Sequence, residues 1–233
     1  MDKIVVVGFS GTLTKHSLSE DAHFLRCDMI GLKRSSPEAH RKQHATKAHY
    51  EIIKEHLGRK YGIRDDMKIC YVENYGKEIE LSGKDVKTCI MTDLFRIANY
   101  QIAAREGLKV FPEGMLDALK AVKKQGYKLA IVSGIRTDII TGILEITGCP
   151  IKFDYIFGHD PVLSRDDKKM LFNELSQKGI ISWLIGDKLS DLEPARKFNA
   201  KSIFVKLGHP TGGEEAFADY SISDAKEIKK IIS

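Results

Sequence analysis

The chain has 233 residues, of which 42% are hydrophobic and 30% charged, with a formal net charge of +5 and a pI of about 8.9. This length predicts one large domain or a core domain with an insert, and the mildly basic charge suits small anionic ligands but is too low to indicate nucleic-acid binding. No apolar run could span a bilayer and no signal-peptide pattern is present, so we expect a cytoplasmic protein with four reduced cysteines.

The N-terminal segment predicts a buried strand at residues 3–7, because it is a short run of β-branched residues. A turn of small residues follows at 8–14, GFSGTLT. Residues 15–107 differ in composition, being rich in Lys, Arg, His and Glu, with apolar residues at helical spacing. We expect three or four helices in this segment, and a short hairpin at 68–81 around an Asn-Tyr-Gly turn.

Strands and helices alternate from residue 108 onward, which predicts a parallel sheet with right-handed crossovers. We therefore predict an α/β protein with a parallel-sheet, Rossmann-like core formed by residues 1–14 and 108–233, and a mainly helical insert at residues 15–107. The expected helices cover residues 112–125, 134–147, 166–178, 191–199 and 225–232, and the expected strands cover 128–132, 155–157, 181–185, 202–205 and 219–222.

Small or acidic residues follow three of these strands, at 8–10 (GFS), at 133–134 (SG) and at 186–187 (GD). In open α/β sheets, ligands bind outside the carboxyl ends of the strands. These residues therefore mark a candidate binding crevice. Because the insert leaves the core from the same edge of the sheet, we expect it to cover the crevice as a lid that supplies basic side chains.

The segments at these strand ends resemble the motifs of the haloacid dehalogenase (HAD) superfamily of phosphatase-like hydrolases. Residues 5–14, VVVGFSGTLT, are similar to the first motif, D-x-D-G-T-L-T, and residues 131–134, IVSG, to the second. Lys168 within RDDKK is similar to the lysine of the third motif, and GDKLSD at 186–191 to the fourth, G-D-x-x-x-D. The resemblance covers the whole core, and it implies that the insert is a helical cap.

The resemblance also implies an altered chemistry. In the family, the first aspartate of the first motif is the nucleophile, the second is the general acid/base, and magnesium lies between the first aspartate and the acids of the fourth motif. Gly8 and Ser10 stand at the two aspartate positions here, so we expect no hydrolysis through an aspartyl-phosphate. The residues expected to bind a phosphorylated ligand are Gly8, Ser10, Gly11, Ser133, Gly134 and Lys168, and those expected to hold magnesium, weakly or only together with that ligand, are Asp187 and Asp191.

Three functional hypotheses remain open on the sequence alone. The first is a pseudoenzyme that binds a phosphorylated small molecule or inorganic phosphate, or that acts with a protein partner or as a homo-oligomer. The second is an active magnesium-dependent phosphatase with a non-standard nucleophile such as Ser10 or Asp93. The third is a purely structural or interaction protein.

Several features also have simpler explanations. The G-x-x-G of residues 8–11 resembles a fragment of a dinucleotide-binding loop, but the acid at the required distance, Asp28, falls in a helical segment. Ser133 suits the cap of a following helix as well as an anion at that helix's N-terminus. His40 and His44 share a helix face, yet no third zinc ligand accompanies them.

The charged residues of the candidate site also have simpler explanations. Lys168 and Lys169 are adjacent in a charged run, and one of them is expected to lie on a solvated face. Asp187 and Asp191 have the spacing of an N-cap and a first-turn acid of the next helix, although the strand-to-Gly-Asp turn favours ligand binding.

Overall fold

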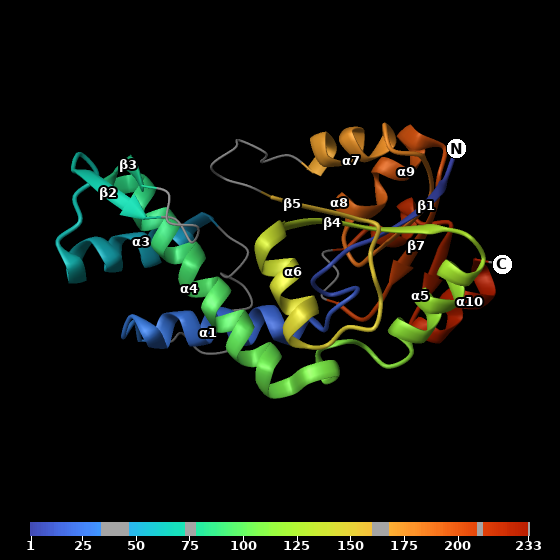
Figure 1. Ribbon diagram of the computed structural model, residues 1–233, viewed down its shortest axis with the longest axis horizontal. Helices are drawn as coiled ribbons and strands as arrows, with labels where there is room; N and C mark the ends of the chain where they lie inside the picture. The colour runs from blue at the N-terminus through green and yellow to red at the C-terminus, as the bar shows by residue number, and fades with distance from the viewer. Residues whose placement is uncertain (34–46, 73–77, 160–167, 209–211, 233) are drawn as a thin grey trace. The chain divides into compact units, whose positions relative to one another are not determined.

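The computed structural model describes residues 1–33, 47–72, 78–159, 168–208 and 212–232 (Figure 1). The chain divides into two units, Met1–Ser19 with Ala103–Ser233, here called the sheet unit, and Glu20–Ile102, here called the insert unit. The divisions fall inside two helices, α1 (His16–Met29) and α4 (Gly83–Glu106). Both connections between the units are therefore helical, and the ends of the insert predicted from composition lie just outside these helices.

The sheet unit is built on six strands in the order β5-β4-β1-β6-β7-β8, and each pairing between neighbours is parallel. This confirms the predicted α/β fold with a parallel, Rossmann-like sheet. Val7 lies opposite Ile131 in β4 and Ile185 in β6, so the carboxyl ends of the three central strands meet at one edge. The strands are β1 (Lys3–Val7), β4 (Lys128–Arg136), β5 (Tyr155–His159), β6 (Ile180–Gly186), β7 (Lys201–Val205) and β8 (Tyr220–Ile222).

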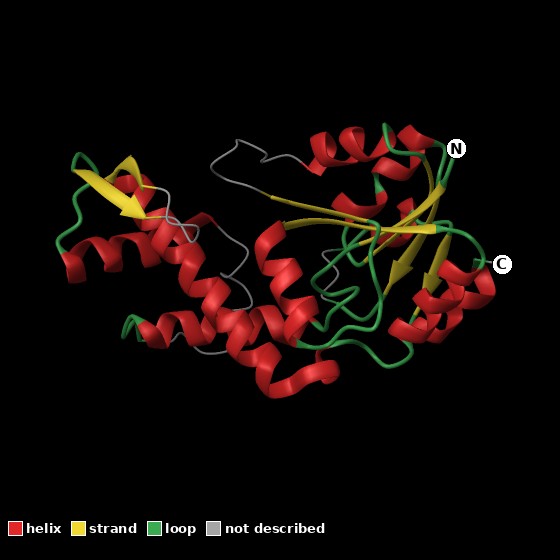
Figure 2. Cartoon of the chain, in the orientation of Figure 1, coloured by secondary structure: helices red, strands yellow, loops and turns green. Residues whose placement is uncertain are grey.

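Helices cover both faces of the sheet (Figure 2). On one face, a hydrophobic cluster joins alternate residues of β1, Ile4 and Val6, to Leu171 and Phe172 of α7 and Ala195 of α9. Burying each such Ile, Leu or Phe side chain contributes about 1.5–3 kcal/mol. The helices are α5 (Met115–Lys124), α6 (Thr137–Ile146), α7 (Lys168–Ser176), α8 (Leu189–Leu192), α9 (Pro194–Phe198) and α10 (Ile228–Ile231), with 3-10 turns η1 (Gly107–Val110), η2 (Glu214–Phe217) and η3 (Ala225–Glu227).

The main differences from the expected bounds concern four elements. Strand β4 runs on through Ser133 and Gly134, so α6 begins three residues later than predicted. Helix α5 begins at Met115 because Gly114, with φ of 77°, stands before it. The helix expected at 191–199 is two short helices, since Pro194 begins a second one. The closing helix expected at 225–232 is a 3-10 turn followed by α10.

The insert unit contains helices α1, α3 (Lys47–Tyr61) and α4, and the expected hairpin, which is formed by β2 (Lys68–Val72) and β3 (Glu78–Ser82) as an antiparallel pair. Cys27 and Ile30 of α1 pack with Ile53 and Leu57 of α3 and Met91 of α4. None of the described helices in the chain is long and apolar enough to cross a membrane.

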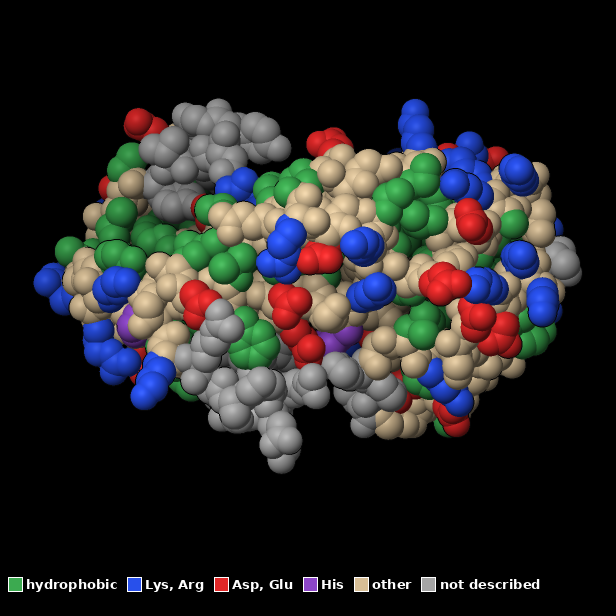
Figure 3. All heavy atoms as spheres, turned by 90° about the horizontal axis from the view of Figure 1, so that it is seen from below, with side chains coloured by type: hydrophobic (Ala, Val, Ile, Leu, Met, Phe, Trp, Pro, Cys, Tyr) green, Lys and Arg blue, Asp and Glu red, His purple; other side chains and the backbone are tan. Residues whose placement is uncertain are grey.

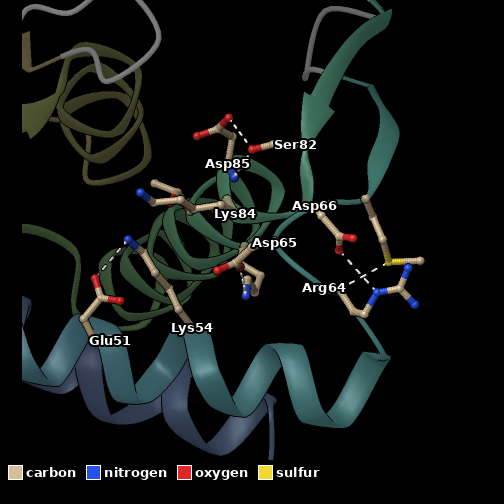
Figure 4. A network of polar contacts seen from close by, with 11 residues as sticks. Glu51, Lys54, Arg64, Asp65, Asp66, Ser82, Lys84 and Asp85 are labelled. Atoms are coloured by element: carbon tan, nitrogen blue, oxygen red, sulfur yellow. Dashed lines mark hydrogen bonds and ion pairs between the residues drawn. The ribbon is translucent and has the colours of Figure 1, made fainter.

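Polar contacts join the hairpin to the start of α4 (Figure 4). The Ser82 hydroxyl donates to Asp85 Oδ2 at 2.6 Å and accepts from the Asp85 backbone N–H at 3.2 Å, which caps the helix. The buried ammonium group of Lys87 pairs with Asp65 at 2.5 Å. The ion pair therefore joins α4 to the segment that follows α3.

Candidate functional site

Backbone hydrogen bonds, one to β6 and one within the loop, hold the loop after β1. The Gly8 N–H donates to Ile185 O at 2.8 Å, and the Gly11 N–H donates to Thr14 O at 2.8 Å. Gly11 has a φ of 84°, a conformation that a residue with a Cβ rarely adopts. This tight path directs the hydroxyl group of Thr12 toward the end of the neighbouring strand β6.

Asp187 follows β6 and is enclosed by backbone. Thr12 Oγ1 donates a hydrogen bond of 2.9 Å to Asp187 Oδ1. A Cβ placed on either Gly11 or Gly208 would collide with the Asp187 carboxylate, which therefore lies between two glycines. The residue is 1% exposed, and its second oxygen, Oδ2, is buried without a hydrogen-bond partner. A buried carboxylate oxygen of this kind is a position at which a cation would relieve an electrostatic cost.

The environment of Asp187 makes its charged form unfavourable. Burial, and then the negative charge of Asp191, raise the pKa of Asp187 to about 6. The positive charge of Lys188 and the hydrogen bond from Thr12 oppose this rise. A carboxyl group with a pKa raised by burial and by a like charge, at the end of a parallel strand, is typical of a functional site.

Asp191 is paired with Lys168. The Lys168 ammonium nitrogen lies 2.6 Å from Asp191 Oδ1 and 3.4 Å from the Ser190 hydroxyl. The Asp191 side chain is 7% exposed and that of Lys168 is 23% exposed, so solvent screens the pair only partly. Lys169 is exposed. Of the two lysines that the sequence left open, Lys168 is the one in contact with the acidic pair.

Gly8 borders directly on this ion pair. A Cβ on Gly8 would lie 3.3 Å from Asp191 Oδ2 and 3.2 Å from Thr12 Oγ1. The ends of β1 and β6, the start of α7 and helix α8 thus bring Gly8, Thr12, Lys168, Asp187 and Asp191 to one place. Gly8 contributes backbone alone to this group of residues.

Ser133 and Gly134 lie at the end of β4, next to β1 in the sheet. The expectation that Ser133 leads into a helix is wrong, because β4 continues to Arg136, which is the N-cap of α6 and makes no side-chain cap bond. Ser133 is 5% exposed, and its hydroxyl accepts a hydrogen bond of 3.0 Å from the Ile135 N–H. It therefore offers no helix N-terminus to an anion.

The structure describes three further sequence candidates. Ser10 is half-buried and pairs through its backbone with Thr14. Asp28 lies in α1 and not at a strand end, which removes the acid required by a dinucleotide loop. Asp93 pairs with Arg96 in α4. His40 and His44 lie outside the described residues.

Sequence reasoning missed two residues that shape the site. Thr12 belongs to the segment that carries the first motif, yet its hydroxyl was not assigned a partner. Gly208 lies in the loop after β7, and the rule that ligands meet the carboxyl ends of parallel strands would have pointed to this loop as well. Both residues determine how closely Asp187 is enclosed.

The residues present fit a divalent cation held by few protein ligands. Asp187 Oδ2 is buried without a partner, and Asp191 lies close enough to raise the pKa of Asp187. Among the residues that the structure describes, no group of three or more His, Cys, Asp or Glu side chains is suited to a metal ion. Magnesium commonly binds one or two carboxylates and takes its other ligands from water and phosphate. Asp187 and Asp191 correspond to that arrangement.

Comparisons with known proteins point to one family. The family model for haloacid dehalogenase-like hydrolases matches residues 38–205. No curated protein sequence matches the chain.

Several solved structures share the fold. A haloacid dehalogenase-like family hydrolase from Streptococcus pneumoniae has a TM-score of 0.66 at 13% identity, with 99% of this chain and 98% of that one covered. The HAD-hydrolase YfnB of Bacillus subtilis, in a form bound to magnesium, has a TM-score of 0.61 at 17% identity, with 100% and 99% covered. CbbY of Rhodobacter sphaeroides, in complex with phosphate, has a TM-score of 0.61 at 17% identity, with 98% and 96% covered.

Proposed function

Because the chain belongs to the haloacid dehalogenase-like hydrolases, we propose that it binds a phosphorylated small molecule or phosphate and has lost the hydrolytic step. The observation that carries this proposal is Gly8. It stands at the end of β1 beside Asp191 and Thr12, where it offers no side chain that could attack phosphorus. Removing the nucleophile of another hydrolase lowers turnover by roughly a millionfold, so the expected loss is close to complete.

The anion would be bound mainly by charge. Lys168 supplies an ammonium group at the start of α7, Ser10 follows β1, and Ser133 lies near the end of the neighbouring strand β4. The Gly8 N–H is already bonded to Ile185 O of β6 and the Gly11 N–H to Thr14 O, so these glycines contribute close backbone approach and not hydrogen bonds. Gly134 has open space where a Cβ would stand, which leaves its backbone accessible. The phosphate complex of the structural neighbour CbbY supports an anion as the ligand.

Magnesium would be held by Asp187 and Asp191. When bound, it would neutralise the charge of a phosphate group that these two carboxylates otherwise repel. The magnesium-bound form of the neighbour YfnB supports this choice of cation. Because the positions of Gly8 and Ser10 lack carboxylates, we propose that the cation binds weakly alone and better together with the anion.

The proposal is tested by incubating the purified protein with magnesium and a panel of phosphate esters. We expect an increase in melting temperature with at least one ester or with inorganic phosphate, and no release of phosphate. Turnover that disappears on Asp187→Ala would instead establish an active magnesium-dependent phosphatase with another nucleophile, such as Ser10. Neither binding nor turnover would favour a structural protein or one that acts through a partner chain.

A gain-of-function experiment tests the missing nucleophile directly. We expect Gly8→Asp combined with Ser10→Asp to produce measurable phosphatase activity, and Ser10→Asp alone to produce none, since acid/base help contributes only about 10²–10⁴-fold. The gain should be partial, because a Cβ at position 8 would lie 3.2 Å from Thr12 Oγ1 and 3.3 Å from Asp191 Oδ2. An activity of the single variant equal to that of the double variant would contradict the role of position 8.

A further inference from the structure

The Lys168–Asp191 ion pair places a cation of the protein on one of the two acids proposed to hold magnesium. The ammonium nitrogen is 2.6 Å from Asp191 Oδ1, and the Ser190 hydroxyl at 3.4 Å is the other hydrogen-bonding neighbour of this group in the described part of the chain. With glycine at position 8, the end of β1 offers Lys168 no carboxylate. Asp191 therefore serves as its counter-ion.

Asp187, the other of the two acids, is not neutralised by an ion pair with Lys168. Asp187 receives one hydrogen bond, from Thr12, and its Oδ2 stays buried without a partner. The two carboxylates are thus unequal, since Asp191 is neutralised by the protein and Asp187 is not. A divalent cation coordinated by both carboxylates would lie close to the ammonium group of Lys168 at Asp191.

Binding of a divalent cation to Asp191 while Lys168 is still paired with it is electrostatically unfavourable. An ammonium group and a divalent cation repel each other strongly at such distances when both are partly shielded from water. Displacing Lys168 from Asp191 would leave a side chain that is only 23% exposed without its counter-charge. A phosphate group supplies the missing negative charge, because it can accept hydrogen bonds from Lys168 and coordinate the cation at the same time.

We propose that Lys168 excludes a divalent cation from Asp191 until an anion draws the ammonium group away, so that cation and anion bind as a coupled pair. This inference rests on the proposed phosphate-binding function and adds the residue that controls it. By linkage, the cation must then raise the affinity for the anion by the same factor by which the anion raises the affinity for the cation.

The test is isothermal titration calorimetry on the full chain with magnesium chloride alone, with inorganic phosphate alone, and with magnesium in the presence of saturating phosphate, at constant ionic strength. For the wild type we expect phosphate to increase the magnesium affinity at least about tenfold, within the usual range of coupling between two sites. Equal magnesium affinities with and without phosphate, in a protein that the phosphate titration shows to bind phosphate, would overturn the inference.

Three variants isolate the part played by Lys168. Lys168→Met keeps the aliphatic length and removes the charge, so it should bind magnesium alone at least about tenfold more tightly than the wild type. Lys168→Arg keeps a cation near Asp191, so without phosphate it should bind magnesium at least about tenfold more weakly than Lys168→Met. If Lys168→Met does not fold, the phosphate dependence of the wild type remains the test. Lys169→Met changes the adjacent exposed lysine and should leave the magnesium affinity unchanged.

The outcomes separate this inference from the proposed function. If Lys168→Met is folded and binds magnesium no better than the wild type, exclusion by Lys168 is refuted. If Lys168→Met gains magnesium affinity while no protein binds phosphate, exclusion by Lys168 is supported and the proposed phosphate site is refuted.

Discussion

At the scale of one residue, Asp187 is a buried carboxylate whose charge is only partly satisfied by its neighbours. Two glycines, at positions 11 and 208, bring backbone against its carboxylate, and one oxygen is left without a partner. Its neighbour Asp191 is equally buried but has an ammonium counter-ion at 2.6 Å. Of these two acids, Asp187 is therefore the one whose charge opposes folding in the absence of a metal ion.

This difference predicts a pH dependence of stability in the presence of a chelator. The pKa of Asp187 is raised to about 6 in the folded protein, whereas an unfolded aspartate has a pKa of about 3.9. Between these values the folded state binds more protons, so stability falls as the pH rises from about 4 to about 6 and levels off above that. At low pH the carboxyl group is protonated in both states and the cost is absent.

Asp187→Asn removes this titration. Its stability relative to the wild type should improve between pH 4 and pH 7 by up to about 3 kcal/mol, which corresponds to a shift of two pKa units. The measurement is urea unfolding at several pH values with EDTA present. A constant difference between the two proteins across this range would contradict the raised pKa.

The sequence predicted the residues of the site better than their contacts. Strand-end position and family resemblance selected Lys168, Asp187 and Asp191, which the structure places together. They did not select Gly208, because a glycine in a loop shows its role only when the side chain that it faces is known. Lys168, which the resemblance to the third motif selected, is the lysine that the structure pairs with Asp191.

At the scale of elements, the end of β4 is a segment whose structure the sequence pattern predicts wrongly. Residues 133–136, SGIR, contain the Ser-Gly pair that commonly ends a strand and caps a helix. Pairing with β5 keeps this segment extended, with a register irregularity between Ser133 and Arg136. Tertiary hydrogen bonds override local preference here, which single-sequence reasoning cannot detect. The order of the elements, by contrast, follows from hydrophobic periodicity and agrees with the sheet.

The junction between the hairpin and α4 supports a second prediction. Gly83 N–H donates to Met67 O at 2.7 Å, and a Cβ on Gly83 would collide with Arg64 O. Gly83→Ala should therefore destabilise the protein by about 1–3 kcal/mol, as overpacking usually does. Gly134→Ala is the control, because a Cβ there meets nothing within 4 Å. Equal melting temperatures of the two variants in differential scanning calorimetry would show that the junction accommodates the added Cβ without loss of stability.

At the scale of the whole molecule, the chain order suggests a role for the insert unit. The chain leaves the sheet unit soon after the loop at the end of β1 and returns through α4. On the face shown in Figure 3, acidic and basic side chains are interspersed. We propose that the insert unit is a cap that closes over the carboxyl ends of the strands.

Closure predicts a change that can be measured in solution. Addition of magnesium with phosphate should lower the radius of gyration in small-angle X-ray scattering, since a closed cap makes the particle smaller. Magnesium or phosphate alone should have less effect. A crystal structure of the complex with residues 17–106 against the amino-terminal edge of the sheet would contradict the proposal.

The helical connections between the two units also bear on how the protein unfolds. Residues on both sides of each division belong to one helix, α1 or α4, whose hydrogen bonds run from each N–H to the carbonyl four residues earlier. Melting either unit must then unwind turns of a helix that the other unit also uses. We expect a single cooperative transition in calorimetry, with van't Hoff and calorimetric enthalpies in agreement, although the chain is built as two units.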